Sequence, residues 1–202
     1  MAYDLKNVFY LDTSTTITKA TAGGGSAQLD LSSYIDPIAR GRAKGTGLAI
    51  YKVHYSIVNS EDSNEVAPKV TDEGVIAVSM QAGLGLGDIA TGGVTTSSPN
   101  AFATSNNLLV SAGNFYSPGA AATSTPIIET YVEPSEKVPY VIVRDNVCLV
   151  YNVSAEKTMT STSLLSVRLE CAQVTLDQAT LNQLLRTQTV EDRDWETSLK
   201  RS

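Results

Sequence analysis

Charged residues are scarce in this chain of 202 residues: 15 are basic and 21 are acidic, which together make 18% of the sequence. A folded domain usually carries about 25% charged residues. The net charge of −6 and the lack of a basic excess argue against a protein whose whole surface grips phosphate backbones. In place of charge the chain has 21 Ser and 22 Thr, so its exposed surface should be rich in hydroxyl groups.

Histidine and cysteine are also rare, with one His and two Cys in the chain. His54 falls in the middle of a predicted strand, and no GxSxG motif presents a serine nucleophile. Zinc sites and cupin-type metal sites need several His or Cys ligands, which this sequence does not offer. We therefore expect no enzymatic activity, no catalytic residue, no metal site and no cofactor.

Cys148 and Cys171 each lie within an apolar alternating run, without a CxxC motif or a nearby His. Free cysteines are often buried, so the sequence favours two free thiols in or near the core. A disulfide between neighbouring strands is the alternative.

Long apolar runs are absent as well. No stretch approaches the ~18 uncharged apolar residues of a membrane helix, and the first residues lack the basic start and apolar stretch of a secretory signal. We expect a soluble chain without a visible export signal. At 21.4 kDa it has room for one domain with a sizeable core.

Apolar and polar residues alternate repeatedly, with turn residues between the runs, which is typical of a multi-stranded antiparallel protein. We expect about eight strands. In the longest run the odd-numbered positions from 49 to 57 should share one face, and the run at 139–153 forms either one strand bulged at Asp145 or two short strands. The predicted strands cover residues 7–12, 27–35, 47–59, 75–82, 107–116, 127–132, 139–153 and 163–176.

One helix is predicted near the end of the chain. Thr175 and Gln178 have the spacing of a capping box, and Leu181, Leu184 and Leu185 follow at helical spacing. The helix should be about three turns long and lie against a sheet or a neighbour.

Glycines punctuate the predicted loops. Gly23, Gly24 and Gly25 are expected to break any strand ladder, and the alternating glycines of residues 83–87 are predicted to be turn residues. Neither segment ends in the GK[ST] sequence of a phosphate-binding loop.

Arg40, Arg42 and Lys44 form the one local concentration of positive charge. Three cations in a glycine-containing loop can hold a phosphate, a lipid head group or an acidic patch on another subunit, so they are candidates for an interface or an anionic ligand. A solvated loop without a specific partner is the alternative. The acidic residues between 61 and 73 match no EF-hand spacing and predict a solvated loop. Trp195, isolated in a charged tail, is a candidate for contact with a neighbouring subunit.

Two stretches carry a resemblance to a known class of protein: the long strand Gly-Leu-Ala-Ile-Tyr-Lys-Val-His-Tyr-Ser-Ile-Val and the closing stretch Arg-Leu-Glu-Cys-Ala-Gln-Val-Thr-Leu. With the uneven strands, the hydroxyl-rich loops and the late helix, the chain resembles the single jelly-roll coat proteins of icosahedral viruses in layout and composition. This resemblance implies an all-β, antiparallel eight-stranded jelly-roll sandwich with one short C-terminal helix. Residues 1–12 would be an N-terminal arm and first strand, residues 13–186 the jelly-roll domain, and residues 187–202 a C-terminal arm.

The resemblance implies a structural capsid subunit, located in the virion, that assembles with copies of itself or with a second coat protein. No specific nucleic-acid binding is predicted, because the chain lacks an Arg-rich N-terminal arm. Contact with an internal membrane or with the genome stays open. One alternative is a carbohydrate- or receptor-binding β-sandwich on a phage or cell surface, favoured by the nine Tyr residues and the hydroxyls. The other alternative is an enzyme whose chemistry uses carboxylates alone, and only the acidic loop supports it.

Overall fold

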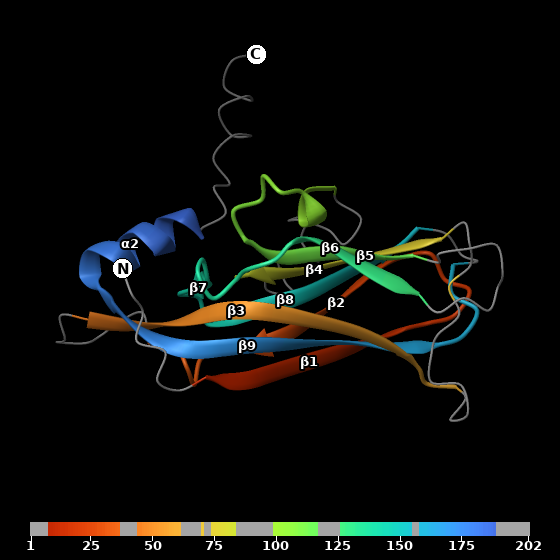
Figure 1. The fold of residues 1–202 in the computed structure, drawn as a ribbon, viewed down its shortest axis with the longest axis horizontal. Helices are drawn as coiled ribbons and strands as arrows, with labels where there is room; N and C mark the ends of the chain where they lie inside the picture. The colour runs from red at the N-terminus through yellow and green to blue at the C-terminus, as the bar shows by residue number, and fades with distance from the viewer. Residues whose placement is uncertain are drawn as a thin grey trace, which may run out of the picture.

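The computed structural model describes residues 8–36, 44–61, 70, 74–83, 99–116, 126–154 and 158–188. Within these residues two antiparallel sheets lie against each other, and a short helix follows the last strand (Figure 1). The predicted all-β class, the two-sheet sandwich and the late helix are thereby confirmed. No helix in the described part of the chain is long and apolar enough to cross a membrane.

The two sheets contain four and five strands. In spatial order the four-stranded sheet consists of β1 (Phe9–Ile17), β9 (Ser163–Asp177), β3 (Lys44–Asn59) and β7 (Tyr140–Ile142). The five-stranded sheet consists, again in spatial order, of β2 (Gly23–Asp30), β8 (Asn146–Val153), β4 (Val75–Ala82), β5 (Leu109–Tyr116) and β6 (Ile127–Val132). The other elements are the 3-10 turn η1 (Pro99–Phe102) and the helix α2 (Gln178–Thr187).

The core lies between the sheets and is built from alternate residues of the strands. Leu165 and Leu169 of β9 belong to the same cluster as Val78 and Met80 of β4, and all four are fully buried. Complete burial of a side chain of this size contributes about 1.5–3 kcal/mol. The period-two pattern of the sequence therefore specifies which face of each strand is internal.

The strands pair in a regular series from the two ends of the chain inward. β1 pairs with β9, β2 with β8, β3 with β7, and β4 with β5, always antiparallel. Only β6 stands outside this series, as an added strand beside β5. The pairings of β3 with β9 and of β4 with β8 then join the pairs into the two sheets.

The first two strands differ from the prediction. β1 extends to Ile17 instead of ending near residue 12, because the Thr-rich stretch pairs with β9 and β-branched residues suit a strand. The expectation that the glycines at 23–25 break a ladder is wrong, since they open β2 and pair with β8. At Gly25 an added Cβ would come within 2.6 Å of the Tyr151 ring, so glycine permits a close approach there.

The long strand β3 contains a bulge that the alternation pattern did not predict. Its register with β9 shifts between Ile50 and Lys52. Before the shift Ile50 faces the core and Tyr51 faces outward, and after it Lys52 also faces outward while Val53 faces the core. Two consecutive residues on one face are the signature of a bulge. The odd-numbered positions from 49 to 57 therefore do not share one face as predicted, because those before the shift face outward and those after it face the core.

The run at 139–153 is two strands, β7 and β8, separated by residues 143–145. This division gives nine strands in the described residues in place of the eight predicted. The helix α2 is confirmed, but its cap is not the predicted one. Thr175 belongs to β9, and the Asp177 carboxylate accepts the Thr180 N–H at 2.7 Å. An Asp at this position satisfies one of the free N–H groups at the helix start.

Candidate interaction surface on the four-stranded sheet

The outer face of the four-stranded sheet is divided into a covered half and an open half. Even-numbered residues of β9 point outward, and from Ala172 to Leu176 they are apolar and buried beneath Leu181 of α2. From Ser166 to Glu170 the outward residues are polar, and the helix does not reach them. The change from polar to apolar side chains along one strand therefore fixes where the helix lies and where the sheet stays open.

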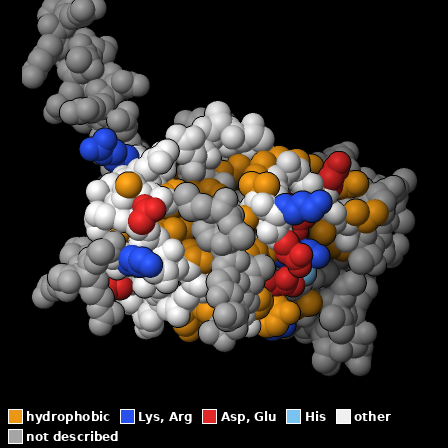
Figure 2. Space-filling view, turned by 60° about the vertical axis from the view of Figure 1, so that its left-hand side comes forward, with side chains coloured by type: hydrophobic (Ala, Val, Ile, Leu, Met, Phe, Trp, Pro, Cys, Tyr) orange, Lys and Arg blue, Asp and Glu red, His pale blue; other side chains and the backbone are white. Residues whose placement is uncertain are grey.

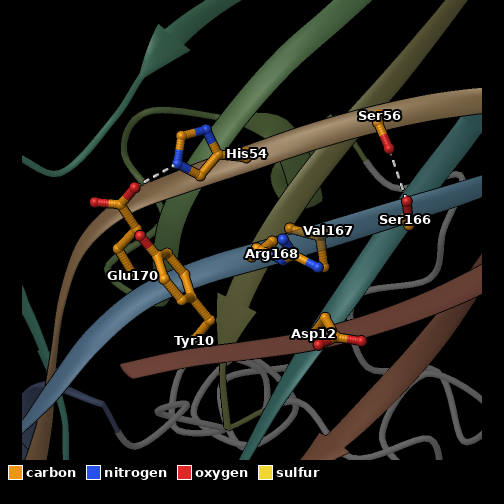
Figure 3. A pocket seen from close by; sticks show the side chains of 8 residues that line it. All are labelled: Tyr10, Asp12, His54, Ser56, Ser166, Val167, Arg168 and Glu170. Atoms are coloured by element: carbon orange, nitrogen blue, oxygen red, sulfur yellow. Dashed lines mark hydrogen bonds and ion pairs between the residues drawn. The ribbon is translucent and has the colours of Figure 1, made fainter. Parts of the chain in front are cut away.

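The open half contains a groove of about 540 Å³, which we call the sheet groove. Three neighbouring strands supply its lining, and most of the side chains stand on the outer face (Figure 3). Figure 2 shows acidic, basic and histidine side chains close together on the described surface, with hydrophobic side chains beside them. The residues lining the sheet groove are Tyr10, Asp12, His54, Ser56, Ser166, Val167, Arg168 and Glu170.

A hydrogen bond crosses the sheet groove between β3 and β9. His54 Nε2 lies 2.7 Å from Glu170 Oε1, and the two side chains are 43% and 30% exposed. The pair is diagonal, because His54 is directly opposite Arg168 in the strand register. A partly exposed pair of this kind is screened by solvent and orders the surface more than it stabilises the fold.

A second diagonal contact joins β9 to the edge strand β1. The Arg168 guanidinium carbon lies 5.9 Å from the centre of the Tyr10 ring, within the range of a cation–π contact. Asp12, directly opposite Arg168 in the register, adds a carboxylate beside it. Tyr10 remains 59% exposed. The sheet groove thus presents an aromatic ring beside charged groups of both signs. This arrangement suits a partner that has both apolar and polar groups.

The serines of the sheet groove do not form a nucleophile site. Ser56 Oγ and Ser166 Oγ lie 2.8 Å apart and bond to each other, while the described partner of His54 is Glu170. A serine nucleophile requires a hydrogen bond to its base, and this geometry does not provide one. Among the described residues, no group of three or more His, Cys, Asp or Glu side chains is placed to hold a metal ion.

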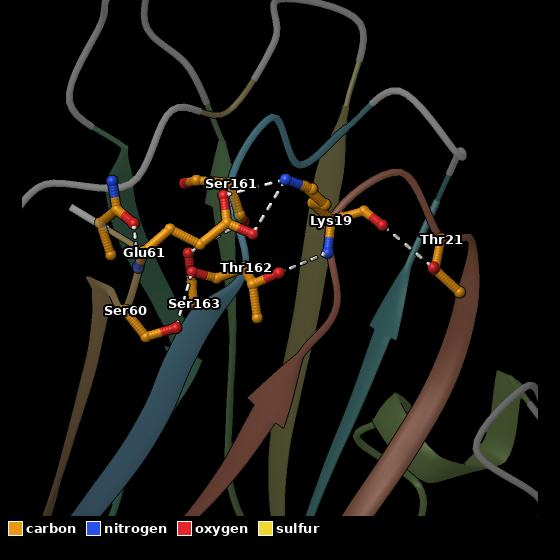
Figure 4. A network of polar contacts seen from close by, with 8 residues as sticks. Lys19, Thr21, Ser60, Glu61, Ser161, Thr162 and Ser163 are labelled. Carbon is orange, nitrogen blue, oxygen red and sulfur yellow. Dashed lines mark hydrogen bonds and ion pairs between the residues drawn. The ribbon is translucent and has the colours of Figure 1, made fainter.

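A polar network ties together one end of the sandwich (Figure 4). Lys19, in the turn after β1, lies 3.1 Å from Glu61 just beyond β3. Hydrogen bonds from Thr162 and Lys19 lower the pKa of Glu61. The Ser60 hydroxyl donates to the Thr162 carbonyl at 2.9 Å. These bonds link the ends of β1, β3 and β9, so Glu61 has a structural role, and the other acidic residues of its loop lie outside the described residues.

The predicted cationic site is only partly described. Arg40 and Arg42 lie outside the described residues, and so does Trp195. Lys44 is exposed at the start of β3, opposite Asp177, whose pKa is lowered mainly by the Thr180 N–H and also by Lys44. Ten residues of strand separate Lys44 from His54, a distance of about 33 Å. The structure therefore does not bring Lys44 to the sheet groove.

The two cysteines are free and buried in different sheets, Cys148 on β8 and Cys171 on β9. Burial raises the pKa of Cys148 to about 11 and that of Cys171 to about 12. This arrangement agrees with the free thiols that the sequence favoured.

Sequence reasoning did not identify the sheet groove. Arg168 and Glu170 alternate with apolar residues, which is a signal for an outward-facing pair, and His54 lies on the mixed face of its own strand. No local sequence pattern links these residues to Tyr10 and Asp12, which lie about 40 positions before His54 and much farther from Arg168 and Glu170. The connection depends on strand order and register, which are set by the whole fold.

Comparisons with known proteins are sparse. No family model and no curated protein sequence matches the chain. One similar solved structure is described as turnip yellow mosaic virus; the alignment has 13% identity and a TM-score of 0.30, and covers 85% of this chain and 93% of that chain. At so low a TM-score, the fold and function have to be inferred from the residues of this chain.

Proposed function

We propose that this chain is a jelly-roll capsid subunit, a non-enzymatic protein that builds a viral shell by contact between copies. The observation that supports this proposal most directly is the strand pairing from the chain ends inward. A jelly roll is a ribbon of paired antiparallel strands, first with last, second with second-last, wrapped into a two-sheet sandwich. Leaving out the added strand β6, this chain has that series of four pairs.

Composition supports a structural role on this fold. A low charge content and many hydroxyls leave the surface free of a strong field of one sign, so copies of the chain do not repel one another strongly. The sheet groove offers polar and aromatic contacts without a nucleophile–base pair. The proposed partners are copies of the chain or a second coat protein, the proposed location is the virion, and Arg40, Arg42, Lys44 and Trp195 are proposed contact residues.

The test of the proposal is assembly of the purified chain. We expect light scattering after size-exclusion chromatography to give a mass far above 21.4 kDa, and electron microscopy of the same fractions to show closed particles. Specific contacts between subunits should each bury at least about 1,000 Å². A chain that stays monomeric at high concentration, alone and with the other proteins of its particle, would overturn the proposal.

A binding module is the second candidate, and the sheet groove is the observation that favours it. The exposed Tyr10 ring beside the Asp12 and Glu170 carboxylates is a combination that can stack on a sugar and accept its hydroxyl hydrogen bonds. A glycan array probed with the isolated chain tests this function. Binding that is lost on Tyr10→Ala but retained on Thr16→Ala, an exposed substitution on the same strand, would support the binding module.

A further inference from the structure

Within the described residues the two sheets have four edge strands, and three of them carry features that discourage pairing with another chain. β7 has only three residues, and the buried Gln188 amide covers its edge by donating to the Val141 carbonyl at 2.5 Å and accepting the Val143 N–H at 3.1 Å. β6 carries Glu129 and a register shift beside it, and β2 begins with three glycines. Short length, charge, bulges and glycine all weaken a strand as a template.

β1 is the fourth edge: it is long, pairs without a bulge and contains no glycine, although it does carry one charged residue, Asp12. Its nine residues pair with β9 without a register shift from Phe9 to Ile17. They include no Pro, Lys or Arg, one acidic residue and a run of four hydroxyl-bearing residues, three of which are Thr, a residue with high strand preference. An edge of this length and regularity is a template for a further strand.

The hydrogen bonds of β1 show which backbone groups are directed away from β9. The Tyr151 hydroxyl, which comes from the other sheet, donates to the Thr16 carbonyl at 3.2 Å. The Thr16 carbonyl therefore points away from β9, and because backbone groups alternate along a strand, Tyr10, Asp12 and Ser14 point the same way. Four residues of β1 thus direct N–H and C=O groups away from β9, and the Thr16 carbonyl, which already accepts from Tyr151, accepts an incoming N–H through its second lone pair.

We propose that β1 pairs antiparallel with β1 of a second copy, about a two-fold axis at Thr13, which joins the two four-stranded sheets into one continuous sheet. This contact rests on the proposed function, because it names one way in which copies of the subunit meet. In this register Thr13 faces Thr13, and all nine residues of each strand are paired. About eight main-chain hydrogen bonds form across the axis, which makes the contact isologous.

The side chains favour this register over its neighbours. With the axis at Thr13, Asp12 lies opposite Ser14 of the second copy and Tyr10 lies opposite Thr16, so no charge faces its own kind directly. An axis at Asp12 would place two carboxylates opposite each other, and an axis at Ser14 would leave Phe9 without a partner residue in β1. The same contact closes the side of the sheet groove formed by Tyr10 and Asp12.

Crosslinking through Thr13→Cys tests the contact. Across the axis the two Cα atoms would lie about 4.5 Å apart, within the range of about 4.4–6.8 Å that a disulfide spans. We expect mild oxidation to convert most of this variant into a disulfide-linked dimer. The wild type is one control, because both of its thiols are buried. Thr15→Cys is the matched control, on the same face and similarly half-buried, with its two copies about 13 Å apart.

Charge at Ser14 gives an independent test that does not depend on a disulfide. Ser14 is exposed, and in the proposed register it lies opposite Asp12 of the second copy. The two-fold axis gives two such pairs in each contact. Ser14→Asp should weaken the contact about twofold to thirtyfold, whereas Ser14→Lys should leave it unchanged or strengthen it. Analytical ultracentrifugation measures both variants. Equal weakening by the two substitutions would overturn the proposed register.

The outcomes separate this inference from the proposed function. Closed particles in which Thr13→Cys fails to crosslink would overturn the β1 contact and leave the shell function standing. Crosslinked dimers that never close into particles would support the β1 contact and overturn the shell function. A strict monomer at every concentration would overturn both.

Discussion

Cys148 and Cys171 are the residues whose chemistry the fold alters most clearly. Cys171 faces the core between the sheets, and Cys148 lies on the outer side of β8 beneath Ala101, Leu108 and part of the η1 segment. Removal from water raises the pKa of both thiols far above neutrality. Because the thiolate is the reactive form, both cysteines should be inert in the folded chain.

We therefore predict that a disulfide reagent such as dithionitrobenzoate does not label the native protein at pH 8 on the scale of minutes. In denaturant both thiols should react at once, giving two equivalents per chain. Labelling of the folded protein should accelerate as the pH rises, because burial raises the pKa of Cys148 to about 11. Rapid labelling of a folded sample at pH 8, with folding checked by circular dichroism, would contradict this prediction.

The helix α2 is an element that depends on a few buried contacts with the sheet. Leu181 is fully buried against Val174 and Leu176 of β9, and an added Cβ at Gly45 of β3 would come within 2.7 Å of it. The helix has only ten residues, too few to be stable alone. Its place over the sheet therefore relies on this packing and on the Asp177 cap.

Leu181→Ala should lower the free energy of unfolding by about 2–5 kcal/mol, because it removes a buried side chain and leaves a cavity. Gln183→Ala, an exposed change on the same helix, is the control and should alter stability by no more than about 0.5 kcal/mol. Urea unfolding followed by circular dichroism measures both. Similar stability for the two variants would show that the helix does not contribute to the fold through Leu181.

Elements with strong alternation and clear turn residues at both ends could be predicted from the sequence. Residues 75–82 and 127–132 are strands with the predicted bounds, β4 and β6. The bulge after Ile50 and the strand that begins at Gly23 could not be predicted from the sequence, because each depends on a neighbouring strand that the local sequence does not identify. The sheet groove depends on three strands at once, so only outward-facing residues such as Arg168 could be anticipated, and not their neighbours.

At the scale of the whole molecule, the pairing of β1 with β9 brings together the two ends of the described chain. Phe9 lies opposite Cys171, and every pair in the series except β4 with β5 spans a long stretch of sequence. Contacts between distant residues are slow to form, because the entropy of closing the chain is lost before the contacts stabilise it.

We predict that refolding from denaturant takes milliseconds to seconds or longer, as in other proteins dominated by non-local strand pairs. Stopped-flow fluorescence of Trp and Tyr residues measures this rate. A chain ending before residue 163 would lack β9, and we expect it to show no cooperative unfolding transition. Refolding in microseconds, or a cooperative transition in the shortened chain, would contradict the importance of this pairing.

The position of β9 at the centre of its sheet also has a consequence for biosynthesis. Tyr10 leaves the ribosome roughly 160 residues before its partner Glu170, a delay of about ten to thirty seconds at ordinary translation rates. Throughout that interval β1 lacks β9, its only pairing partner among the described strands. A nascent polypeptide that has not yet reached residue 163 therefore lacks the strand that orders β1, and the exposed edge of β1 forms only after β9 has been synthesised.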